Sequence, residues 1–222
     1  MAAKKISVII SAYNESKHIT NVLGKTKKYA KSIIVVDDGS RDNTAELAKK
    51  EGVIVLKHIV NLGKGAAMKT GCEYAIKKGI KLLIMMDADG QHDPAEIPNF
   101  VSQIKSKKVD IVFGSRRLSA KMPFARRLGN WLITRATKIL FGVDLRDTQS
   151  GFRAFTSYAY KKIRWKSTGY AVESEMIANV GKHKLKYSEI PIQTIYLDKY
   201  KGMNIVEGMK IALRMMWWRL TK

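Results

Sequence analysis

Two acids follow directly on an apolar run in the segment LLIMMDADGQHDP, residues 82–94. The apolar part is typical of a buried strand that ends in a turn. The carboxylates of Asp87 and Asp89 would repel each other there, and their desolvation costs free energy unless a cation lies between them. Oxygen ligands from these two acids, with Gln91 as a third, suit Mg²⁺ or Mn²⁺. Surface exposure in an ordinary strand-to-helix turn is the alternative, and it is the commoner one for an isolated D-x-D pair.

Spacing excludes several other metal and cofactor sites. Counted from Asp87, His92 and Pro98 stand where a calcium EF-hand needs Gly and Glu. No G-x-G-x-x-G follows the first expected strand, which disfavours a dinucleotide cofactor. The four histidines do not pair at zinc-ligand spacing, and Cys72 is the single cysteine. The glycines of NLGKGAAMKTG, residues 61–71, lack the spacing of a phosphate-binding loop, so they either place a helix N-terminus near a phosphate or serve a tight turn.

The elements expected in the first 115 residues position these acids. Aliphatic runs alternate with helix patterns, which indicates a mostly parallel sheet covered by helices on both faces. Strands are expected at 6–11, 32–38, 53–58, 81–86 and 110–115, and helices at 15–30, 43–51, 63–78 and 95–106. Polar clusters occupy the carboxyl ends of three of these strands, and their members are Tyr13, Asn14, Glu15, Asp37, Asp38, Asp87 and Asp89. Because ligands of such sheets bind beyond the carboxyl ends of the strands, the three clusters predict one site.

The second half is expected to be less regular and to hold two amphipathic helices. An Arg-rich helix with Trp131 at its middle is expected at 123–141, a turn and short strand at 148–155, a helix at 173–180 and a strand at 188–196. The segment 203–220 places Glu207, Lys210 and Arg214 at helical spacing, with Met, Ile, Leu and Trp over the rest. It either lies in a membrane interface or packs on the core, and the sequence favours neither. No apolar stretch approaches 18 residues, so we expect no membrane-spanning helix.

The charge of the chain is strongly positive and uneven. Its 222 residues, which suit one large domain, include 41 basic and 19 acidic ones, for a net charge of +22. No acid occurs between residues 111 and 143, whereas seven Lys and Arg residues do. Such a region attracts a polyanion, which is a nucleic acid, an anionic membrane or a phosphorylated substrate. The single cysteine excludes an internal disulfide framework and suits a reducing compartment.

Six segments occur together along the chain: SVIISAYNE, IIVVDDGSRDNT, NLGKGAA, MMDADGQHDP, FGSRR and DTQSGFRAF. In order and spacing they resemble family-2 glycosyltransferases with the GT-A fold, and among these most of all the dolichyl-phosphate mannose and glucose synthases. The resemblance covers residues 5–200. It implies an α/β domain with the GT-A nucleotide-sugar-binding fold at 1–200, followed by a C-terminal amphipathic helix at 201–222.

The resemblance also implies roles for individual residues. The nucleotide pocket would be lined by Ala12, Tyr13, Asn14, Glu15, Asp37, Asp38, Lys64, Asp87 and Lys199. The metal would be bound by Asp87, Asp89 and Gln91, the acceptor phosphate by Arg116, Arg126 and Asn130, and the catalytic residues would be Asp89, Arg116, Arg126 and Glu175. Ser11 and Asn130 depart from the usual proline and serine at their positions. In KYKGMNI, residues 199–205, Lys199 replaces the arginine of the family's usual loop.

The implied reaction is the inverting transfer of a hexose from GDP-mannose or UDP-glucose to a polyprenyl (dolichyl) phosphate, with Mg²⁺ or Mn²⁺ as cofactor. A phosphate monoester is already largely anionic at neutral pH, so a general base would add little. Glu173 and Glu175 lie two residues apart on an expected helix, so at most one should face the site. A lipid acceptor implies a cytoplasmic enzyme that is peripheral on the anionic cytoplasmic face of the membrane, alone, as a homo-oligomer or through a membrane-protein partner.

Two other functions stay open on the residues alone. The same fold could transfer sugar to a soluble, protein or polysaccharide acceptor. The net charge of +22 also suits a nucleic-acid-binding protein. That class predicts aromatic residues interleaved with basic ones, and it gives no reason for acids at three strand ends. We therefore expect no nucleic-acid partner.

Overall fold

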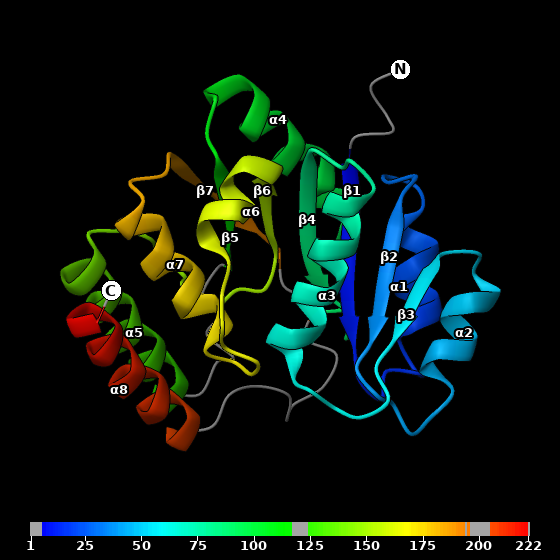
Figure 1. The fold of residues 1–222 in the computed structure, drawn as a ribbon, viewed down its shortest axis with the longest axis horizontal. Helices are drawn as coiled ribbons and strands as arrows, with labels where there is room; N and C mark the ends of the chain where they lie inside the picture. The colour runs from blue at the N-terminus through cyan, green and yellow to red at the C-terminus, as the bar shows by residue number, and fades with distance from the viewer. Residues whose placement is uncertain (1–5, 117–123, 194, 196–204, 222) are drawn as a thin grey trace.

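A seven-stranded sheet forms the centre of the protein in a computed structural model, which describes residues 6–116, 124–193, 195 and 205–221 (Figure 1). The strand order is β3-β2-β1-β4-β6-β5-β7, and β6 alone runs antiparallel to both of its neighbours. The strands are β1 (Ile6–Ala12), β2 (Ile33–Asp37), β3 (Ile54–Lys57), β4 (Leu82–Asp87), β5 (Ile111–Arg116), β6 (Arg153–Thr156) and β7 (Tyr187–Ile192). The sheet confirms the expected mostly parallel α/β fold.

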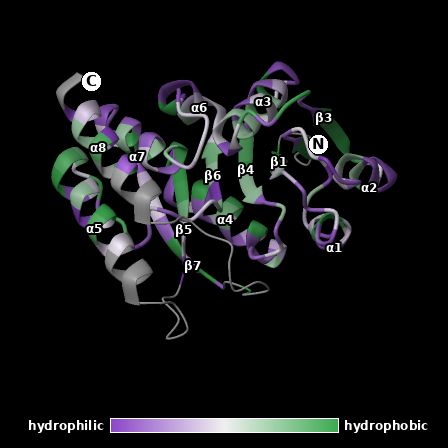
Figure 2. Ribbon diagram, turned by 90° about the horizontal axis from the view of Figure 1, so that it is seen from below, coloured by the Kyte–Doolittle hydropathy of each residue, from purple (hydrophilic) through white to green (hydrophobic). Residues whose placement is uncertain are grey.

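Helices cover both faces of the sheet (Figures 1 and 2). They are α1 (Ile19–Thr26), α2 (Thr44–Lys50), α3 (Lys64–Lys77), α4 (Ile97–Lys107), α5 (Phe124–Phe141), α6 (Ser157–Ile163), α7 (Val172–Lys182) and α8 (Ile205–Thr221), with a short 3-10 helix η2 (Pro94–Glu96) before α4. One apolar cluster joins α3, α6 and α7 to one face, and a second joins α1, α2 and α4 to the other. Neighbouring strand residues point to opposite faces, so Ile9 enters the first cluster and Ile10 the second.

The first helix begins later than its sequence pattern indicated. We expected a helix from residue 15, but α1 begins at Ile19. The backbone amides of Asn14, Glu15 and Ser16 donate to side chains between β2 and the first residue of α2, namely to Ser40 Oγ, Thr44 Oγ1 and Asp42 Oδ2. These bonds anchor residues 14–16 to the segment after β2, and the left-handed φ of 54° at Asn14 separates this loop from the helix that follows. The short helix α6 was not expected at all.

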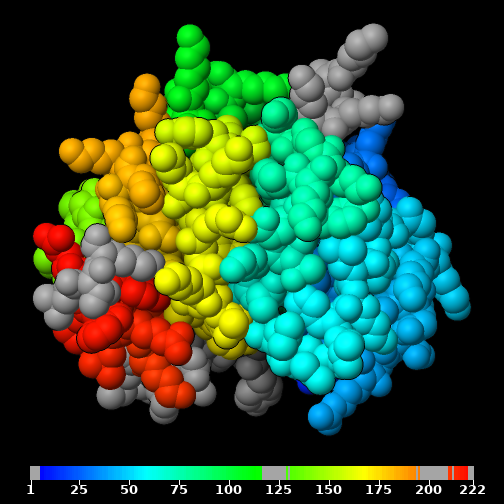
Figure 3. Space-filling model, in the orientation of Figure 1, coloured from blue at the N-terminus to red at the C-terminus, as the bar shows by residue number. Residues whose placement is uncertain are grey.

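An outer layer lies at one end of the sheet, where α5 and α8 pack on each other and on α7 (Figures 1 and 3). Their shared cluster contains Ile133 of α5, Ala178 of α7, and Ile211, Met215 and Trp218 of α8. The C-terminal helix therefore packs on the protein with one side. None of the helices in the described ranges is long and apolar enough to cross a membrane.

Candidate active site

The carboxyl ends of β2, β1 and β4 bring the predicted acids to one edge of the sheet. In the strand register Ala12 of β1 pairs with Asp37 of β2, and Ser11 of β1 pairs with Asp87 of β4. This edge is the lower one in Figure 1. Because the three strands are adjacent, the clusters predicted to form one site do lie side by side.

Asp37 is fully buried at the end of β2. Its Oδ1 accepts a hydrogen bond of 3.3 Å from the amide of Ser40. Its Oδ2 lies 4.0 Å from Nζ of Lys57 and accepts no hydrogen bond from any described residue. A buried carboxylate oxygen without a donor is costly, so this atom is suited to accept a hydrogen bond from a ligand.

Asp38 differs from Asp37 because backbone amides of the protein donate hydrogen bonds to both of its carboxylate oxygens. Oδ1 accepts from the amide of Leu62 at 3.0 Å, and Oδ2 from the amide of Gly63 at 2.8 Å. Nδ1 of His58 lies 2.7 Å from Oδ1, and Nε2 of His58 lies 2.9 Å from Oγ1 of Thr70 on α3. Asp38 therefore holds the loop that leads into α3, and so positions Lys64, the first residue of that helix.

Glycines at the start of α3 allow the backbone of another loop to approach closely. Gly63 has a φ of 95°, and a Cβ on it would lie 2.5 Å from the carbonyl oxygen of Thr168. A Cβ on Gly65 would lie 2.3 Å from the carbonyl oxygen of Ser167. The indole of Trp165 also donates to the carbonyl of Gly65 at 2.8 Å. Close packing against this loop, together with the positive φ of Gly63, accounts for both glycines.

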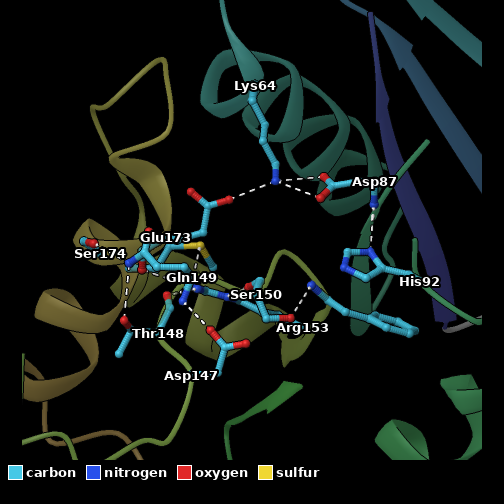
Figure 4. A network of polar contacts seen from close by, with 12 residues as sticks. Lys64, Asp87, His92, Asp147, Thr148, Gln149, Ser150, Arg153, Glu173 and Ser174 are labelled. Atoms are coloured by element: carbon cyan, nitrogen blue, oxygen red, sulfur yellow. Dashed lines mark hydrogen bonds and ion pairs between the residues drawn. The ribbon is translucent and has the colours of Figure 1, made fainter. Parts of the chain in front are cut away.

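Lys64 lies at the centre of the site, between two acids (Figure 4). Its ammonium is 2.9 Å from each oxygen of Asp87 and 2.9 Å from Oε1 of Glu173. Burial opposes the charge of Lys64, but Asp87 and Glu173 outweigh it and raise the pKa of the ammonium above its usual value. Burial likewise opposes ionisation of Asp87, while Lys64 outweighs it and keeps the pKa of this carboxyl low. Lys64 and Asp87 are therefore both charged at neutral pH.

Asp89 fits the chemistry of a metal ligand. Burial and, next, the charge of Asp87 raise the pKa of its carboxyl, so a further cation nearby would be stabilising. Its Oδ1 accepts from the amide of Gln91 at 3.0 Å, and the carbonyl of Gln91 accepts from the amide of Ile195 at 3.0 Å. Carboxylate oxygens, and the amide oxygen of a Gln side chain, are hard donors of the kind that Mg²⁺ and Mn²⁺ prefer. Within the described residues, no three His, Cys, Asp or Glu side chains form a metal-binding group by themselves.

His92 supports this turn from inside the protein. Its ring is buried, lies 5.1 Å from the ring of Phe152, and accepts at Nδ1 from the amide of Asp87 at 3.2 Å. Burial lowers the pKa of His92 below its usual value, so the ring stays neutral and keeps this acceptor.

Arg116, at the end of β5, forms a two-pronged pair with Asp147. Its Nε lies 2.6 Å from Oδ2 of Asp147, and its Nη2 lies 3.1 Å from Oδ1. Burial opposes ionisation of Asp147, but Arg116 outweighs it and lowers the pKa of that carboxyl. The pair fixes the guanidinium at the edge of the site. Arg126 and Asn130 belong to α5, but their side chains lie outside the described part of the chain, as does all of Lys199.

Arg153 on β6 is a residue of the site region that the sequence interpretation did not single out. It is 1% exposed, and it donates to the carbonyl oxygens of Thr148, Ser150 and Glu173 at 2.8, 2.9 and 3.0 Å (Figure 4). Burial lowers the pKa of Arg153 to about 10, so the group stays charged at neutral pH. Its bonds join the turn at 147–150 to the start of α7. A basic residue inside the apolar stretch GFRAF was the signal that could have found it.

Of the two acids on α7, Glu173 contacts Lys64, whereas Glu175 points to a different loop. Oε2 of Glu175 accepts from the amides of Lys166 and Ser167 at 3.1 and 2.8 Å, and from Oγ of Ser167 at 2.6 Å. Glu175 thus holds the loop that packs against Gly63 and Gly65. We expected at most one of the pair to face the site, and the resemblance gives a catalytic role to Glu175. In the structure Glu173 is the acid beside Lys64, and Glu175 binds the loop instead.

Comparison with known proteins places this geometry in a family. Residues 7–164 match the glycosyl transferase family 2. The chain belongs to this family. Its GT-A fold is also that of glucosyl-3-phosphoglycerate synthase from Mycobacterium tuberculosis, solved in complex with Mn²⁺, UDP and phosphoglyceric acid. That structure aligns with a TM-score of 0.74 and 17% identity over 99% of this chain and 78% of the other.

Curated relatives extend over almost the whole length of this glycosyltransferase. The UDP-N-acetylglucosamine–dolichyl-phosphate N-acetylglucosaminyltransferase of Methanococcus voltae is 35% identical, and the match covers 100% of this chain and 99% of the relative. The polyprenol monophosphomannose synthase of Mycolicibacterium smegmatis is 28% identical, over 92% of this chain and 84% of the relative. Both names describe sugar transfer to a polyprenyl phosphate, with different sugars.

Proposed function

We propose that this glycosyltransferase transfers a sugar from a nucleotide sugar to a polyprenyl phosphate, with inversion at the anomeric carbon. The observation that carries the proposal is a group of acids at one edge of the sheet: the buried Asp37 and the partly buried Asp87 and Asp89 at the ends of strands, and the buried Glu173 of α7. Lys64 lies between Asp87 and Glu173. Such a group suits a donor that combines a hydrogen-bonding nucleoside with a diphosphate.

Each part of the donor has a matching group. Oδ2 of Asp37, which accepts no hydrogen bond from the part of the chain that the structure describes, would accept from the base or the ribose. Asp87 and Asp89, with Gln91, would hold Mg²⁺ or Mn²⁺, and the bound ion would neutralise charge on the departing diphosphate. Glu173 and Lys64 lie beside Asp87, where they can orient the sugar and the diphosphate. Asn14 and Tyr13, on the loop after β1, would border the nucleoside.

The acceptor is proposed from the basic residues beyond β5 and from the names of the relatives. Arg116 is held by Asp147 in an orientation that leaves it at the edge of the site, and Arg is suited to bidentate contact with a phosphate. Arg126 and Asn130 follow in a segment without acids. A phosphate acceptor attacks as an anion, so the chain needs no base at the attacking oxygen. Positioning and electrostatic stabilisation would supply most of the rate enhancement.

The donor is proposed to be UDP-N-acetylglucosamine, with UDP-glucose and GDP-mannose as the other candidates. The relative that spans all of this chain is named for the first of these. The second relative is named for mannose transfer. A hexose donor and an N-acetylhexosamine donor differ at one substituent of the sugar ring, which a single side chain can distinguish.

A polyprenyl acceptor also requires contact with a membrane, which we propose for the surface of α5 and α8. Six large apolar side chains on these helices are exposed, and we call them the α5–α8 surface: Trp131, Leu132, Ile139, Leu213, Met216 and Trp217. Arg135, Lys138, Lys210, Arg214 and Arg219 are exposed on the same helices. Aromatic and apolar side chains among cations suit the interface of an anionic leaflet, to which each cation contributes about 1 kcal/mol. The proposed location is the cytoplasmic face.

Substitution of Asp89 tests the proposed site. We expect Asp89→Ala to lower metal-dependent sugar transfer by about a hundredfold or more, because a ligand beside the departing diphosphate is lost. Asp144→Ala, which removes an exposed carboxylate from the turn after α5, is the matched control and should retain activity. Equal activity of Asp89→Ala and the wild type would refute the assignment of the site.

A further inference from the structure

Lys64 donates all of its hydrogen bonds to acids that the proposed reaction needs for other purposes. An ammonium has three donors, and the contacts of 2.9 Å to Oδ1 and Oδ2 of Asp87 and to Oε1 of Glu173 use all three. In this arrangement Lys64 has none left for a diphosphate. The same contacts cover both oxygens of Asp87, which is a proposed metal ligand.

The backbone of Lys64 is held on several sides, so that only its side chain can move. Asp38 binds the amides of Leu62 and Gly63, and a Cβ on Gly63 or Gly65 would collide with the loop at 167–168. A Cβ on Gly151 would lie 2.6 Å from Oδ2 of Asp87 and 2.9 Å from Nζ of Lys64. The ion pair is thus enclosed on one side by backbone. The flexible stem of a lysine still allows its ammonium to turn.

Glu173 offers the ammonium a second position. Glu173 is 4% exposed, and its Oε2 accepts no hydrogen bond from any described residue. Lys64 can therefore give up Asp87 and gain a bond to Oε2 while it stays beside Oε1. A buried carboxylate oxygen that lacks a donor favours such an exchange.

We propose that Lys64 is an internal counter-ion that occupies Asp87 until a divalent cation displaces it, and that the displaced ammonium then binds the diphosphate of the donor from beside Glu173. This inference rests on the proposed function for its metal and its donor. It assigns Lys64 two successive partners, so that metal binding and donor binding are coupled through one side chain. Lys64 weakens binding of the metal alone and strengthens binding of the donor diphosphate once the metal is present.

Binding of Mn²⁺ and of UDP by the full chain tests the inference without any turnover. Mn²⁺ is titrated alone by electron paramagnetic resonance, and UDP is titrated by calorimetry at saturating Mn²⁺. For Lys64→Met we expect Mn²⁺ alone to bind about tenfold more tightly, because a competing positive charge is gone. We expect UDP to bind about tenfold more weakly, because a charge-assisted hydrogen bond to the diphosphate is lost.

Two further variants make the result specific. Lys69→Met removes the same charge from an exposed position on α3 and should change neither affinity more than about twofold, since solvent screens it. Lys64→Gln keeps a polar side chain beside Asp87, and it should shift both affinities in the same directions as Lys64→Met if the methionine variant folds poorly.

Three results would overturn the inference. One is an unchanged or weaker affinity for Mn²⁺ in both Lys64 variants, and another is a gain that Lys69→Met reproduces. The third is tighter Mn²⁺ binding with UDP binding unchanged, which would show that Lys64 never reaches the diphosphate. Tighter Mn²⁺ binding together with weaker UDP binding in the Lys64 variants, without any transfer to polyprenyl phosphate by the wild type, would support the inference while refuting the proposed acceptor.

Discussion

At the scale of single residues, Arg153 is a cation that lies almost completely buried next to the site. It is buried against the ring of Phe113, whose centroid is 5.0 Å from its guanidinium carbon, and its acceptors are uncharged carbonyls and the sulfur of Met176. A buried cation without a direct carboxylate partner is tolerated only when its donors are satisfied. Its role is to fix the turn at 147–150 against α7, and thereby Asp147 and Glu173.

We expect Arg153→Met to lower the free energy of unfolding by about 2–4 kcal/mol, because three buried carbonyl oxygens lose their donor. Arg153→Lys should also destabilise the protein, because one ammonium cannot reach all three carbonyls in the geometry of the guanidinium fork. Urea denaturation followed by circular dichroism measures both. Stability equal to that of the wild type in Arg153→Met would contradict the role given to this residue.

The residues that the sequence could indicate are those whose chemistry is local. Asp37 and Asp87 end their strands and Asp89 lies just beyond one, so the parallel order of those strands was enough to bring them together. The sequence could not show that Asp38 and Glu175 bind loops of the protein, whereas the nearby acids Asp37 and Glu173 face the site. The bonds of Asp38 and Glu175 go to loops at 62–63 and 166–167, and the position of those loops depends on the packing of α3 against the segment before α7.

At the scale of elements, the start of α3 depends on the absence of side chains at its glycines. In Gly65→Ala the new Cβ would lie 2.3 Å from the carbonyl oxygen of Ser167, so the helix or the loop has to shift. We expect a loss of about 1–3 kcal/mol in stability and weaker binding of UDP, since Lys64 moves with the helix. Gly24→Ala is the control, because nothing lies within 4 Å of its Cβ.

Gly24→Ala should leave UDP binding unchanged and stabilise the protein by up to about 1 kcal/mol, because alanine favours a helix more than glycine does. Thermal unfolding and a UDP titration compare the two variants. A Gly65→Ala protein as stable as the wild type would show that the loop at 167–168 does not press on α3.

The loop before α2 depends on the charge of Asp42. Partial burial opposes its ionisation, but hydrogen bonds from Thr44 and Ser16 outweigh this effect and lower the pKa of Asp42 to about 2. Because the carboxyl is ionised more readily in the folded state, its contribution is complete above about pH 4 and is lost as the pH falls toward 2. Asp42→Asn should therefore be about 1 kcal/mol less stable than the wild type near pH 7.

The difference between Asp42→Asn and the wild type should shrink as the pH falls below 4, and urea denaturation at several pH values measures it. Asp144→Asn serves as a control, because an exposed ion pair contributes little at any pH. A difference for Asp42→Asn that stays constant down to pH 3 would rule out the proposed role of the charge.

Periodicity predicted most elements because their apolar faces are determined locally. The runs that became β1, β2, β4 and β5 are mostly apolar and almost entirely buried, as expected for strands covered on both faces. The start of α1 was missed, since the amides of residues 14–16 bond to a loop that is distant in the chain. The short α6 was missed as well. Its seven residues give too little length for a helical pattern, although Thr156 caps it by accepting from the amide of Ala159.

At the scale of the whole molecule, the outer layer of α5 and α8 shows which side of the C-terminal helix packs on the protein. The C-terminal segment was compatible with packing on the core and with a membrane interface. Ile211, Met215 and Trp218 are buried against α5 and α7, while Leu213, Met216 and Trp217 are exposed. Helical periodicity could predict two faces but not which neighbour would cover one of them.

Vesicle binding tests the proposed role of the α5–α8 surface. We expect the protein to sediment with vesicles that contain phosphatidylglycerol, less with pure phosphatidylcholine, and less again at high salt, because the cations act through screened electrostatics. Replacing Trp131 and Trp217 by serine should reduce binding to anionic vesicles several-fold. Tyr29→Ser, which removes an exposed aromatic ring next to α1, is the control. Unchanged binding of the double variant would exclude this surface as the membrane contact.

The central claim is that the acceptor is a polyprenyl phosphate. The most direct test incubates the protein with Mn²⁺ and labelled UDP-N-acetylglucosamine, UDP-glucose or GDP-mannose, and offers either a short polyprenyl phosphate or the matching polyprenol. We predict label in the organic extract with one of these donors, only with the phosphate acceptor, and not with Asp89→Ala. Transfer to the alcohol at an equal rate, or no transfer to the phosphate from any donor that binds, would contradict the claim.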